Sequence, residues 1–291
     1  MTNSIMLSDN VPYKISQFFR TSNFDSLIFK NDSSLLNEIL LDTKIKKDLK
    51  GKNFFYAFDY FFNIINQHYK NEYVFKNIIA NRLIKGRHKL ANVAYMNEFH
   101  VLNSICDVAI FNGTSTAYEI KTGLDNLDRI SSQLTDYKKV FEKIFIVCDD
   151  SKIKILEQTL DKDVGIIRLT HRKQMSTIRE ASSNIENLSI SALFKSLRNS
   201  EILDYMKKKY DYIPDISPKK TRNDCLNLFQ KMDIIEAHNV FVNILRKREL
   251  KNEEKRSIEK LPFSLLALML NIRPSLRRLK IISSRLENQI L

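Results

Sequence analysis

The chain has 291 residues, of which 43% are hydrophobic and 28% are charged, and its formal net charge is +13. This length allows one large domain or two small ones, and the hydrophobic fraction excludes a disordered chain. Residues 171–291 hold 24 Lys and Arg against 14 Asp and Glu, whereas the first 170 residues hold 23 against 20. Such an excess attracts polyanions, nucleic acid first, although a protein with a merely basic surface is the alternative.

The three cysteines are too few for a disulfide framework, and no CxxC pair points to zinc. Cys106 and Cys148 lie in apolar runs, so we expect both thiols in the core. The first residues lack a basic segment followed by an apolar run, which predicts no signal peptide. No stretch approaches ~18 uninterrupted apolar residues, so no membrane span or membrane partner is expected. These features favour a cytoplasmic protein.

Residues 1–70 form the first expected region, which is helical with loops. A helical stripe over 35–41 follows the cap signal at Asp32-Ser33-Ser34. Aromatic residues crowd the segment 54–69, a pattern typical of a buried helix. Stacking of bases on these rings is the alternative.

Residues 71–175 form the second expected region, in which the hydrophobic period changes from helical to alternating. A helix is predicted over 72–84, and a turn at Asn112-Gly113. A second helix, capped by Asp125 or Asn126, carries apolar residues from Leu127 to Phe141. Strands are predicted over 93–102, 105–111, 117–121, 144–148 and 164–169. Up to the fourth strand the order is α-β-β-β-α-β, and a helix and a further strand follow.

Residues 176–291 form the third expected region, which reads as helices only. Pro274 is expected to break or kink the last helix. That helix carries several arginines among its apolar residues, so it has either a solvated face or a face that grips phosphate. The predicted helices cover 190–197, 202–210, 225–248 and 265–291.

Two charged residues stand in the third predicted strand of the second region. Glu119 and Lys121 are two residues apart, so their side chains leave the strand on one face. Burying a carboxylate and an ammonium without partners is costly, and a metal ion and a phosphate would supply those partners. The alternative is an exposed Glu–Lys pair on an edge strand, with Asp107 capping a turn.

Asp107 lies in the preceding strand, twelve residues before Glu119. A two-residue turn at Asn112-Gly113 would place the two carboxylates on opposite faces of the hairpin. A loop with an odd number of residues, or a bulge, would place them opposite each other. We predict the odd register, because two carboxylates on one face form a site for a divalent cation.

Hard oxygen ligands of this kind suit Mg²⁺ or Mn²⁺. The backbone carbonyl of Ile120, between Glu119 and Lys121, is a further expected ligand. The metal would polarise a phosphodiester oxygen and lower the pKa of a bound water. Lys121 would steady the scissile phosphate or position the attacking water.

The order of Asp107 and then Glu119-x-Lys121, within the predicted α-β-β-β-α-β succession, resembles the PD-(D/E)xK nuclease superfamily over about residues 72–170. The resemblance implies an α/β fold with a restriction-endonuclease-like core and a mixed sheet, flanked here by helical N-terminal and C-terminal regions. Two positions depart from the pattern. Cys106 replaces the usual proline, and Ile105 stands where many members of a similar small bacterial branch have a basic residue.

The resemblance also implies roles for residues beyond the three central ones. In several branches the next helix carries a glutamine and an aromatic residue near the site, and Gln133 and Tyr137 share one helix face here. Gln133 is the expected fourth catalytic residue. Tyr137 and Arg129, which lies one turn before Gln133, are expected to contact substrate. Glu98, on the first strand, matches a position that is acidic in that branch and is an expected further metal ligand.

Taken together, these features predict a Mg²⁺- or Mn²⁺-dependent endonuclease that hydrolyses phosphodiester bonds, in DNA rather than RNA. The alternative is a non-catalytic nucleic-acid-binding or assembly protein that keeps a nuclease-like fold. A homo-oligomer would suit double-strand cutting, although no residue pattern requires one.

Overall fold

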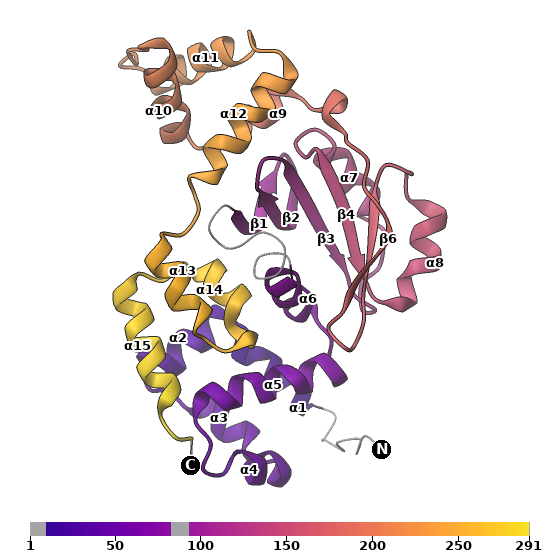
Figure 1. Cartoon of the computed structure of the whole chain (residues 1–291), viewed down its shortest axis with the longest axis vertical. Helices are drawn as coiled ribbons and strands as arrows, with labels where there is room; N and C mark the ends of the chain where they lie inside the picture. Colours follow the sequence, from indigo (N-terminus) through magenta and orange to yellow (C-terminus); the bar gives the residue numbers. More distant parts are fainter. Residues whose placement is uncertain (1–9, 83–92, 291) are drawn as a thin grey trace. The chain divides into compact units, whose positions relative to one another are not determined.

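The structure is a computed structural model that describes residues 10–82 and 93–290 (Figure 1). The chain divides into two compact units. Unit 1 joins residues 1–87 to residues 250–291, and unit 2 is continuous over residues 88–249. Among the described residues, no helix is both long and apolar enough to span a membrane.

Unit 1 is helical in its described residues. Its longest helix, α5, begins at the N-cap Asn53, whose side chain accepts a hydrogen bond from the backbone N–H of Tyr56. The helices are α1 (Val11–Ser16), η1 (Gln17–Phe19), α2 (Thr21–Phe29), α3 (Ser34–Ile39), α4 (Thr43–Leu49), α5 (Phe54–His68), α6 (Glu72–Ile79), α13 (Asn252–Glu259), η5 (Phe263–Leu265), α14 (Leu266–Ile272) and α15 (Leu276–Glu287).

The aromatic run of α5 divides between two environments. Phe54, Phe58, Phe61 and Phe62 are buried, as a core helix requires. Phe55 and Tyr56 are instead exposed. The expected buried helix is therefore confirmed for the phenylalanine stripe, while two rings remain in contact with solvent.

Hydrogen bonds explain why the two ends of the chain share one unit. On α6, the Asn77 side chain donates to the carbonyl of Phe263 at 2.9 Å and accepts from the backbone N–H of Ala267 at 3.0 Å. The Tyr73 hydroxyl donates to the carbonyl of Ser264 at 2.6 Å. These buried polar groups fix α6 to η5 and α14, so residues far apart in sequence form one core.

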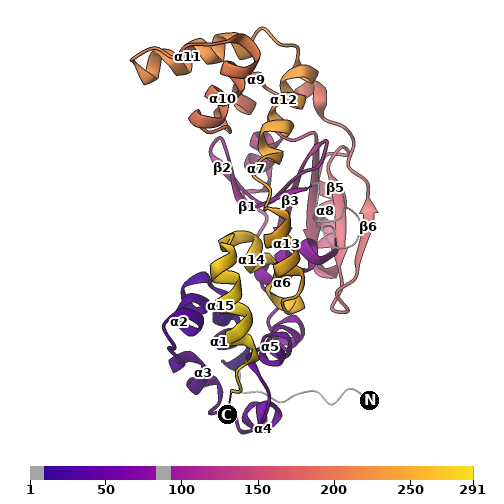
Figure 2. The same ribbon diagram turned by 60° about the vertical axis from the view of Figure 1, so that its left-hand side comes forward.

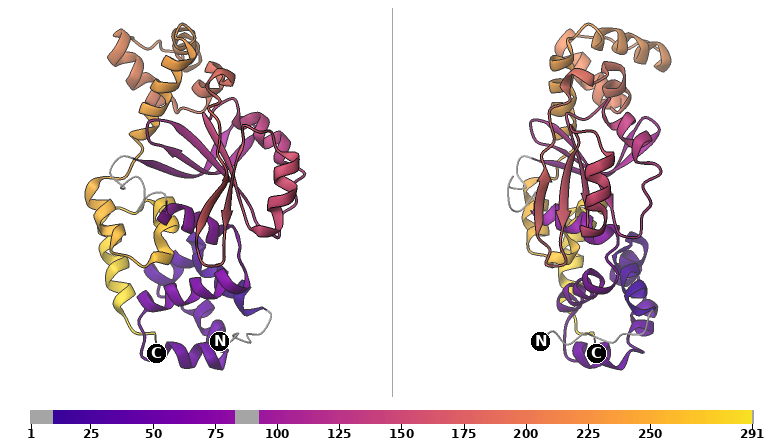
Figure 3. Two further views of the ribbon diagram at one scale, coloured as in Figure 1. Left: turned by 45° about the vertical axis from the view of Figure 1, so that its right-hand side comes forward. Right: turned by 90° about the vertical axis from the view of Figure 1, so that its right-hand side faces the viewer.

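Unit 2 is built on a six-stranded mixed sheet whose spatial order, β1-β2-β3-β4-β5-β6, follows the chain. The first three strands pair antiparallel, β3-β4-β5 pair parallel, and β6 returns antiparallel. Figure 3 shows the twist of this sheet. The strands are β1 (Ala94–Val101), β2 (Ser104–Phe111), β3 (Ser115–Lys121), β4 (Lys143–Cys148), β5 (Gly165–Leu169) and β6 (Met175–Arg179).

Helices complete the core of unit 2. Residues of α7 and α8 share one buried apolar cluster with the sheet, and the cluster continues into the helices α9 to α12, which Figure 2 shows as one group. On α12, the buried His238 ring nitrogen lies 2.8 Å from the Ser115 hydroxyl of β3. The helices are α7 (Ile130–Tyr137), α8 (Asp150–Thr159), η4 (Ile185–Asn187), α9 (Ile190–Lys195), α10 (Asn199–Tyr210), α11 (Pro218–Phe229) and α12 (Ile234–Arg246).

The predicted order of elements from 72 to 170 is confirmed, including the helix and strand after β4. The expectation of helices only beyond residue 176 is wrong at β6, a short strand whose residues are mostly half-buried and so lack an apolar signal. The helix predicted over 225–248 is two helices, because Asp233 caps a new one. The break near Pro274 is confirmed, with Arg273 in the left-handed conformation.

Some boundaries also differ. The helix predicted over 72–84 ends as α6 at Ile79, and residues 83 and 84 lie outside the described residues. The predicted cap of the second helix is wrong, because α7 begins at Ile130 and the Asp125 carboxylate instead accepts from the backbone N–H and hydroxyl of Thr122. Such a local turn competes with helix capping.

The two units also differ from the three consecutive regions expected from sequence. The third expected region divides between the two units: residues 176–249 belong to unit 2, and residues 250–291 belong to unit 1. Contacts account for this, since Phe241 of α12 packs edge-on against Phe111 of β2 at 5.7 Å. The mixed α/β fold, with a six-stranded mixed sheet and many helices, agrees with the expected class.

Candidate functional site

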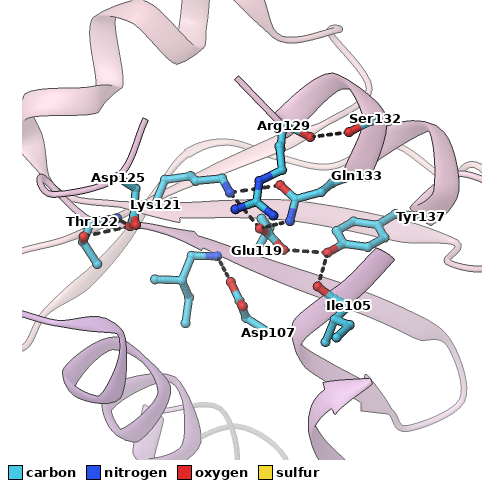
Figure 4. A network of polar contacts seen from close by, with 12 residues as sticks. Ile105, Asp107, Glu119, Lys121, Thr122, Asp125, Arg129, Ser132, Gln133 and Tyr137 are labelled. Carbon is cyan, nitrogen blue, oxygen red and sulfur yellow. Dashed lines mark hydrogen bonds and ion pairs between the residues drawn. The ribbon is translucent and has the colours of Figure 1, made fainter. Parts of the chain in front are cut away.

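The central strand β3 is buried along its whole length, and it carries both charged residues predicted from sequence. Glu119 is 2% exposed and Lys121 is 8% exposed. Both face α7, from which Gln133 and Tyr137 point back toward the strand (Figure 4). The alternative of an exposed Glu–Lys pair on an edge strand is therefore wrong, because β3 lies between β2 and β4.

Three side chains donate hydrogen bonds to the Glu119 carboxylate. Its Oε1 accepts from Lys121 Nζ at 2.8 Å and from Gln133 Nε2 at 2.7 Å. Its Oε2 lies 2.7 Å from the Tyr137 hydroxyl. Gln133 closes the ring, because its Oε1 accepts from Lys121 Nζ at 3.0 Å. A buried ion pair survives desolvation only with such additional bonds, so the network fixes the position of the Lys121 ammonium.

The Tyr137 hydroxyl lies between two acceptors. It is 2.7 Å from Glu119 Oε2 and also 2.7 Å from the backbone carbonyl of Ile105. Burial raises the pKa of Tyr137 well above its ordinary value, and the nearby Cys106 and Glu119 raise it further. The phenol therefore keeps its single hydrogen, which can serve only one of the two acceptors at a time.

The hairpin register brings Asp107 beside β3 as predicted. Val108 pairs with Tyr118 and Phe111 with Ser115, which leaves a three-residue loop over 112–114. This odd register is confirmed, and Gly113 in the loop has a φ of +113°, which favours glycine. Continuing the same count by one step places Asp107 opposite Glu119.

Asp107 nevertheless turns toward the backbone of β3. Its Oδ2 accepts from the N–H of Ile120 at 2.7 Å, replacing a ladder bond between the strands. The N–H and C=O of one strand residue point toward the same neighbouring strand, so the Ile120 carbonyl faces the gap that holds Asp107. The expected carbonyl ligand and the expected aspartate ligand therefore share one side of β3.

Glu98 occupies the same rung of the sheet on β1, opposite Asp107, but its backbone is not extended. Its φ is +52°, an uncommon conformation for a residue other than glycine. Before Glu98, the side chains of β1 in the core cluster are at even positions, Ala94 and Met96. After it they are at odd positions, Phe99 and Val101, so the face that points to the core shifts by one residue at Glu98. Within residues 10–82 and 93–290, no three His, Cys, Asp or Glu converge as a metal-binding group, and Glu98 does not join the two carboxylates.

Cys106, buried beside the site, is a neutral thiol. Burial raises its pKa well above the ordinary value, and the charges of Glu119 and Asp107 raise it further. The thiol donates to the carbonyl of Val108 at 3.2 Å. The expectation of a core thiol is confirmed here, and Cys148 is buried as well. A nucleophilic thiolate is excluded at this position, because the thiolate is the reactive form.

A pocket of about 400 Å³ opens onto the network from the α7 side. Lys121 and Gln133 line it, together with the exposed Arg129 at the start of α7. Glu119, Asp107 and Tyr137 do not line it, so the pocket reaches the Lys121 end of the network and not the carboxylates of Glu119 and Asp107. The other lining residues are Asn103, Ser104, Ile105, Asp125, Asn126 and Ser132.

The wall formed by the β1–β2 turn was not predicted. Asp136 of α7 holds that turn, since its carboxylate accepts from the N–H of Asn103 at 3.2 Å and from the Ser104 hydroxyl at 2.6 Å. In the sequence this turn is marked only by the polar residues Asn103 and Ser104 before the apolar strand, a pattern that is common in hairpins and indicates no pocket. The turn lines the pocket because α7 packs against the hairpin, a tertiary contact that no local pattern of residues predicts.

The donor chemistry of the site fits a divalent cation. Mg²⁺ is commonly held by one or two carboxylates, with water and phosphate completing its shell. A carboxylate offers about four acceptor positions, of which the three bonds to Glu119 use at most three. Asp107 Oδ2 accepts from the Ile120 N–H on the β2 side of β3. The residues that would hold the ion are thus Asp107, Glu119 and Ile120.

Comparisons with known proteins connect the chain to a bacteriophage family. The family model described as Bacteriophage P4 protein cII matches residues 66–261. Protein cII of Enterobacteria phage P4 is 36% identical over 80 residues, which is 27% of this chain and 30% of that protein. The alignment thus spans less than a third of the length of this curated relative.

Among solved structures, the SPO1766 protein of unknown function from Silicibacter pomeroyi is similar at 13% identity. The similarity covers 43% of this chain and 85% of that chain, with a TM-score of 0.29. The match to the family model extends over more than half of the residues, and the chain therefore belongs to the bacteriophage P4 protein cII family.

Proposed function

We propose that unit 2 is a metal-dependent nuclease that hydrolyses phosphodiester bonds, in DNA rather than RNA. One observation carries the proposal: Glu119 and Gln133 hold the Lys121 ammonium at the wall of a polar pocket, with Asp107 on the adjacent strand. The order β1-β2-β3-α7-β4 within unit 2 supports a restriction-endonuclease-like core, as does the resemblance to the PD-(D/E)xK superfamily, while α6, which precedes β1 in the chain, belongs to unit 1.

Each residue has a role that follows from its contacts. The pocket presents Lys121 and Arg129 to an incoming phosphodiester, whose anionic oxygens accept charge-assisted hydrogen bonds from ammonium and guanidinium groups. Gln133 orients Lys121 through its amide oxygen and Glu119 through its amide nitrogen. Tyr137 positions Glu119 from behind and does not reach the pocket.

Asp107 and Glu119 would hold Mg²⁺ or Mn²⁺ beside this phosphate site. When bound, such a cation polarises a phosphate oxygen and lowers the pKa of a coordinated water. Lys121, fixed between Glu119 and Gln133, then steadies the phosphate without having to reorganise.

A second candidate function is non-catalytic binding of nucleic acid. The observation that favours it is the burial of Glu119, which is 2% exposed and whose carboxylate accepts hydrogen bonds from three protein donors, which compete with a metal ion. If no cation enters, the pocket still offers Lys121 and Arg129 to a phosphate.

The most informative variant is Asp107→Asn, because asparagine can still accept from the Ile120 N–H while losing the negative charge. We expect plasmid cleavage with Mg²⁺ or Mn²⁺ by the full chain, and a loss of roughly 100-fold or more in this variant and in Lys121→Ala. Lys154→Ala, an exposed lysine of α8, is the matched control and should cleave normally. Circular dichroism establishes that each variant is folded.

Calorimetric titration with Mn²⁺ separates the two candidate functions. Binding by the wild type that is weakened at least ~10-fold in Asp107→Asn supports the metal site, since a carboxylate ligand is lost. Oligonucleotide binding that Lys121→Ala weakens, without cleavage of plasmid or RNA and without Mn²⁺ binding, supports the non-catalytic candidate and rejects the nuclease.

A further inference from the structure

A basic surface lies in unit 1, on α4, on the segment that links α4 to α5, and on the first turn of α5. Five lysines stand within nine residues, and all are exposed. Two exposed aromatic residues follow directly in the chain, Phe55 and Tyr56. We call this the lysine–aromatic surface, and it consists of Lys44, Lys46, Lys47, Lys50, Lys52, Phe55 and Tyr56. Figure 1 labels the helices α4 and α5 that carry it.

The positive charge of this surface is not neutralised locally. None of its five lysines is ion-paired with a carboxylate in the described part of the chain. The two aspartates nearby are engaged elsewhere. Asp42 accepts from the backbone N–H groups that begin α4, and Asp48 accepts from the Tyr60 hydroxyl at 2.7 Å. The surface therefore favours an anionic partner.

The two aromatic rings are available for stacking. Phe55 is 39% exposed and Tyr56 is 44% exposed, although their neighbours on α5 are buried. Tyr56 lies parallel to Tyr60, with ring centroids 6.1 Å apart and planes 19° apart. Lys52 Nζ lies 5.1 Å from the centre of the Tyr56 ring. This lysine has a flexible stem, so it can turn to a phosphate when a base takes its place over the ring.

The backbone beneath the surface is held in place before any partner binds. Gly51 adopts a φ of +68°, which turns the chain between α4 and α5. The C-terminal residues then pair with the next segment: Ile290 N–H donates to the carbonyl of Lys52 at 2.9 Å, and Phe54 N–H donates to that of Asn288 at 3.1 Å. A preorganised surface loses less entropy on binding.

We infer that the lysine–aromatic surface binds single-stranded nucleic acid, with bases stacked on Tyr56 and Phe55 and phosphates contacted by the lysines. Exposed rings combined with a basic track are the usual composition of sites for unpaired strands. A duplex offers phosphates to the lysines but no free base face to the rings, because its bases already stack on one another. The inference concerns unit 1 alone and does not depend on nuclease activity in unit 2.

Fluorescence anisotropy of the full chain with labelled oligothymidylate, in EDTA, tests the inference without cleavage. We expect tighter binding to the single strand than to a duplex, and a loss of roughly 10-fold in Tyr56→Ala. Tyr56→Phe retains the ring and should bind like the wild type. Equal affinity of Tyr56→Ala and wild type would overturn the inference, as would a preference for duplex.

The lysines are tested by the salt dependence of the same binding. The triple variant Lys46→Gln, Lys47→Gln, Lys50→Gln should bind more weakly and with a shallower dependence on salt, because fewer counterions are released. The matched control removes three exposed lysines of unit 2, Lys207, Lys208 and Lys219, and should leave both quantities unchanged. Binding to phosphatidylserine vesicles but not to oligothymidylate would identify an anionic lipid surface as the partner and reject the inference.

Discussion

Each unit holds a lysine that is withdrawn from solvent and paired with a carboxylate, but the two carboxylates differ. The side chains of Lys121 in unit 2 and Lys76 in unit 1 are 11% and 10% exposed. Their partners, Glu119 and Glu72, are 3% and 52% exposed. Lys76 thus reaches a carboxylate that water still solvates, whereas Lys121 and Glu119 depend on each other. The free energy cost of a buried lysine charge therefore depends on whether its partner carboxylate is buried or solvated.

The largest expected effect comes from removing the Lys121 charge. Lys121→Met keeps the hydrocarbon stem but leaves Glu119 buried and unpaired, and should lower the free energy of unfolding by about 3–5 kcal/mol. Lys76→Met, the matched variant, should lower it by less than about 1 kcal/mol, since Glu72 remains solvated. Urea denaturation measures both. Equal losses in the two variants would contradict the comparison.

A second effect is expected at the tyrosines. Tyr137→Phe removes the donor shared by Glu119 and Ile105, leaving buried acceptors unsatisfied, and should destabilise the chain by about 1–3 kcal/mol. Tyr60→Phe in unit 1 removes a comparable bond to Asp48, which water can replace because both groups are half-buried. Thermal unfolding of the two variants should therefore separate them. A larger loss in Tyr60→Phe would refute this account.

His238 predicts a dependence of stability on pH in unit 2. Burial lowers its pKa below the ordinary 6.5, and the nearby Glu142 only partly opposes the shift. The unfolded chain therefore binds the proton more readily, so stability should fall as pH drops below about 6.5. His238→Gln keeps a polar group for Ser115 and should reduce this dependence. Unfolding measured in urea at several pH values compares the two proteins.

The smallest effect is expected at Glu72. Glu72→Gln removes an exposed partner of Lys76 and an acidic residue in the first turn of α6. The loss should be about 0.3–1 kcal/mol and should shrink with added salt, because exposed ion pairs and helix-dipole contacts are screened. A loss that is independent of salt would indicate that this pair is shielded from water.

Sequence patterns predicted the strands and the shared face of Glu119 and Lys121, because alternation assigns faces directly. The contact of Gln133 with this pair was implied by the family resemblance and not by the spacing of residues. Sequence patterns also predicted the odd register, which follows from the need to pair Asp107 with Glu119. The left-handed backbone at Glu98 was not predictable, since alternation assumes an extended strand. Neither was β6, whose half-buried residues carry no strong period.

The division into units was also beyond the sequence patterns. The bonds from Asn77 to Phe263 and Ala267 join segments about 190 residues apart, and no local period records such a partner. The charge excess after residue 170 points to the C-terminal helices, whereas the lysine–aromatic surface lies within residues 44–56. A regional charge total hides a compact cluster of this size.

The agreement between strand order and chain order has a consequence for synthesis on the ribosome. Each strand of unit 2 pairs with the strand made just before it, so the sheet can grow at one edge as the polypeptide emerges. Unit 1 cannot complete its core in this way, because α6 bonds to residues 263–267, which follow unit 2 in the chain. The polar contacts that fix α6 can therefore form only after the whole of unit 2 has been translated.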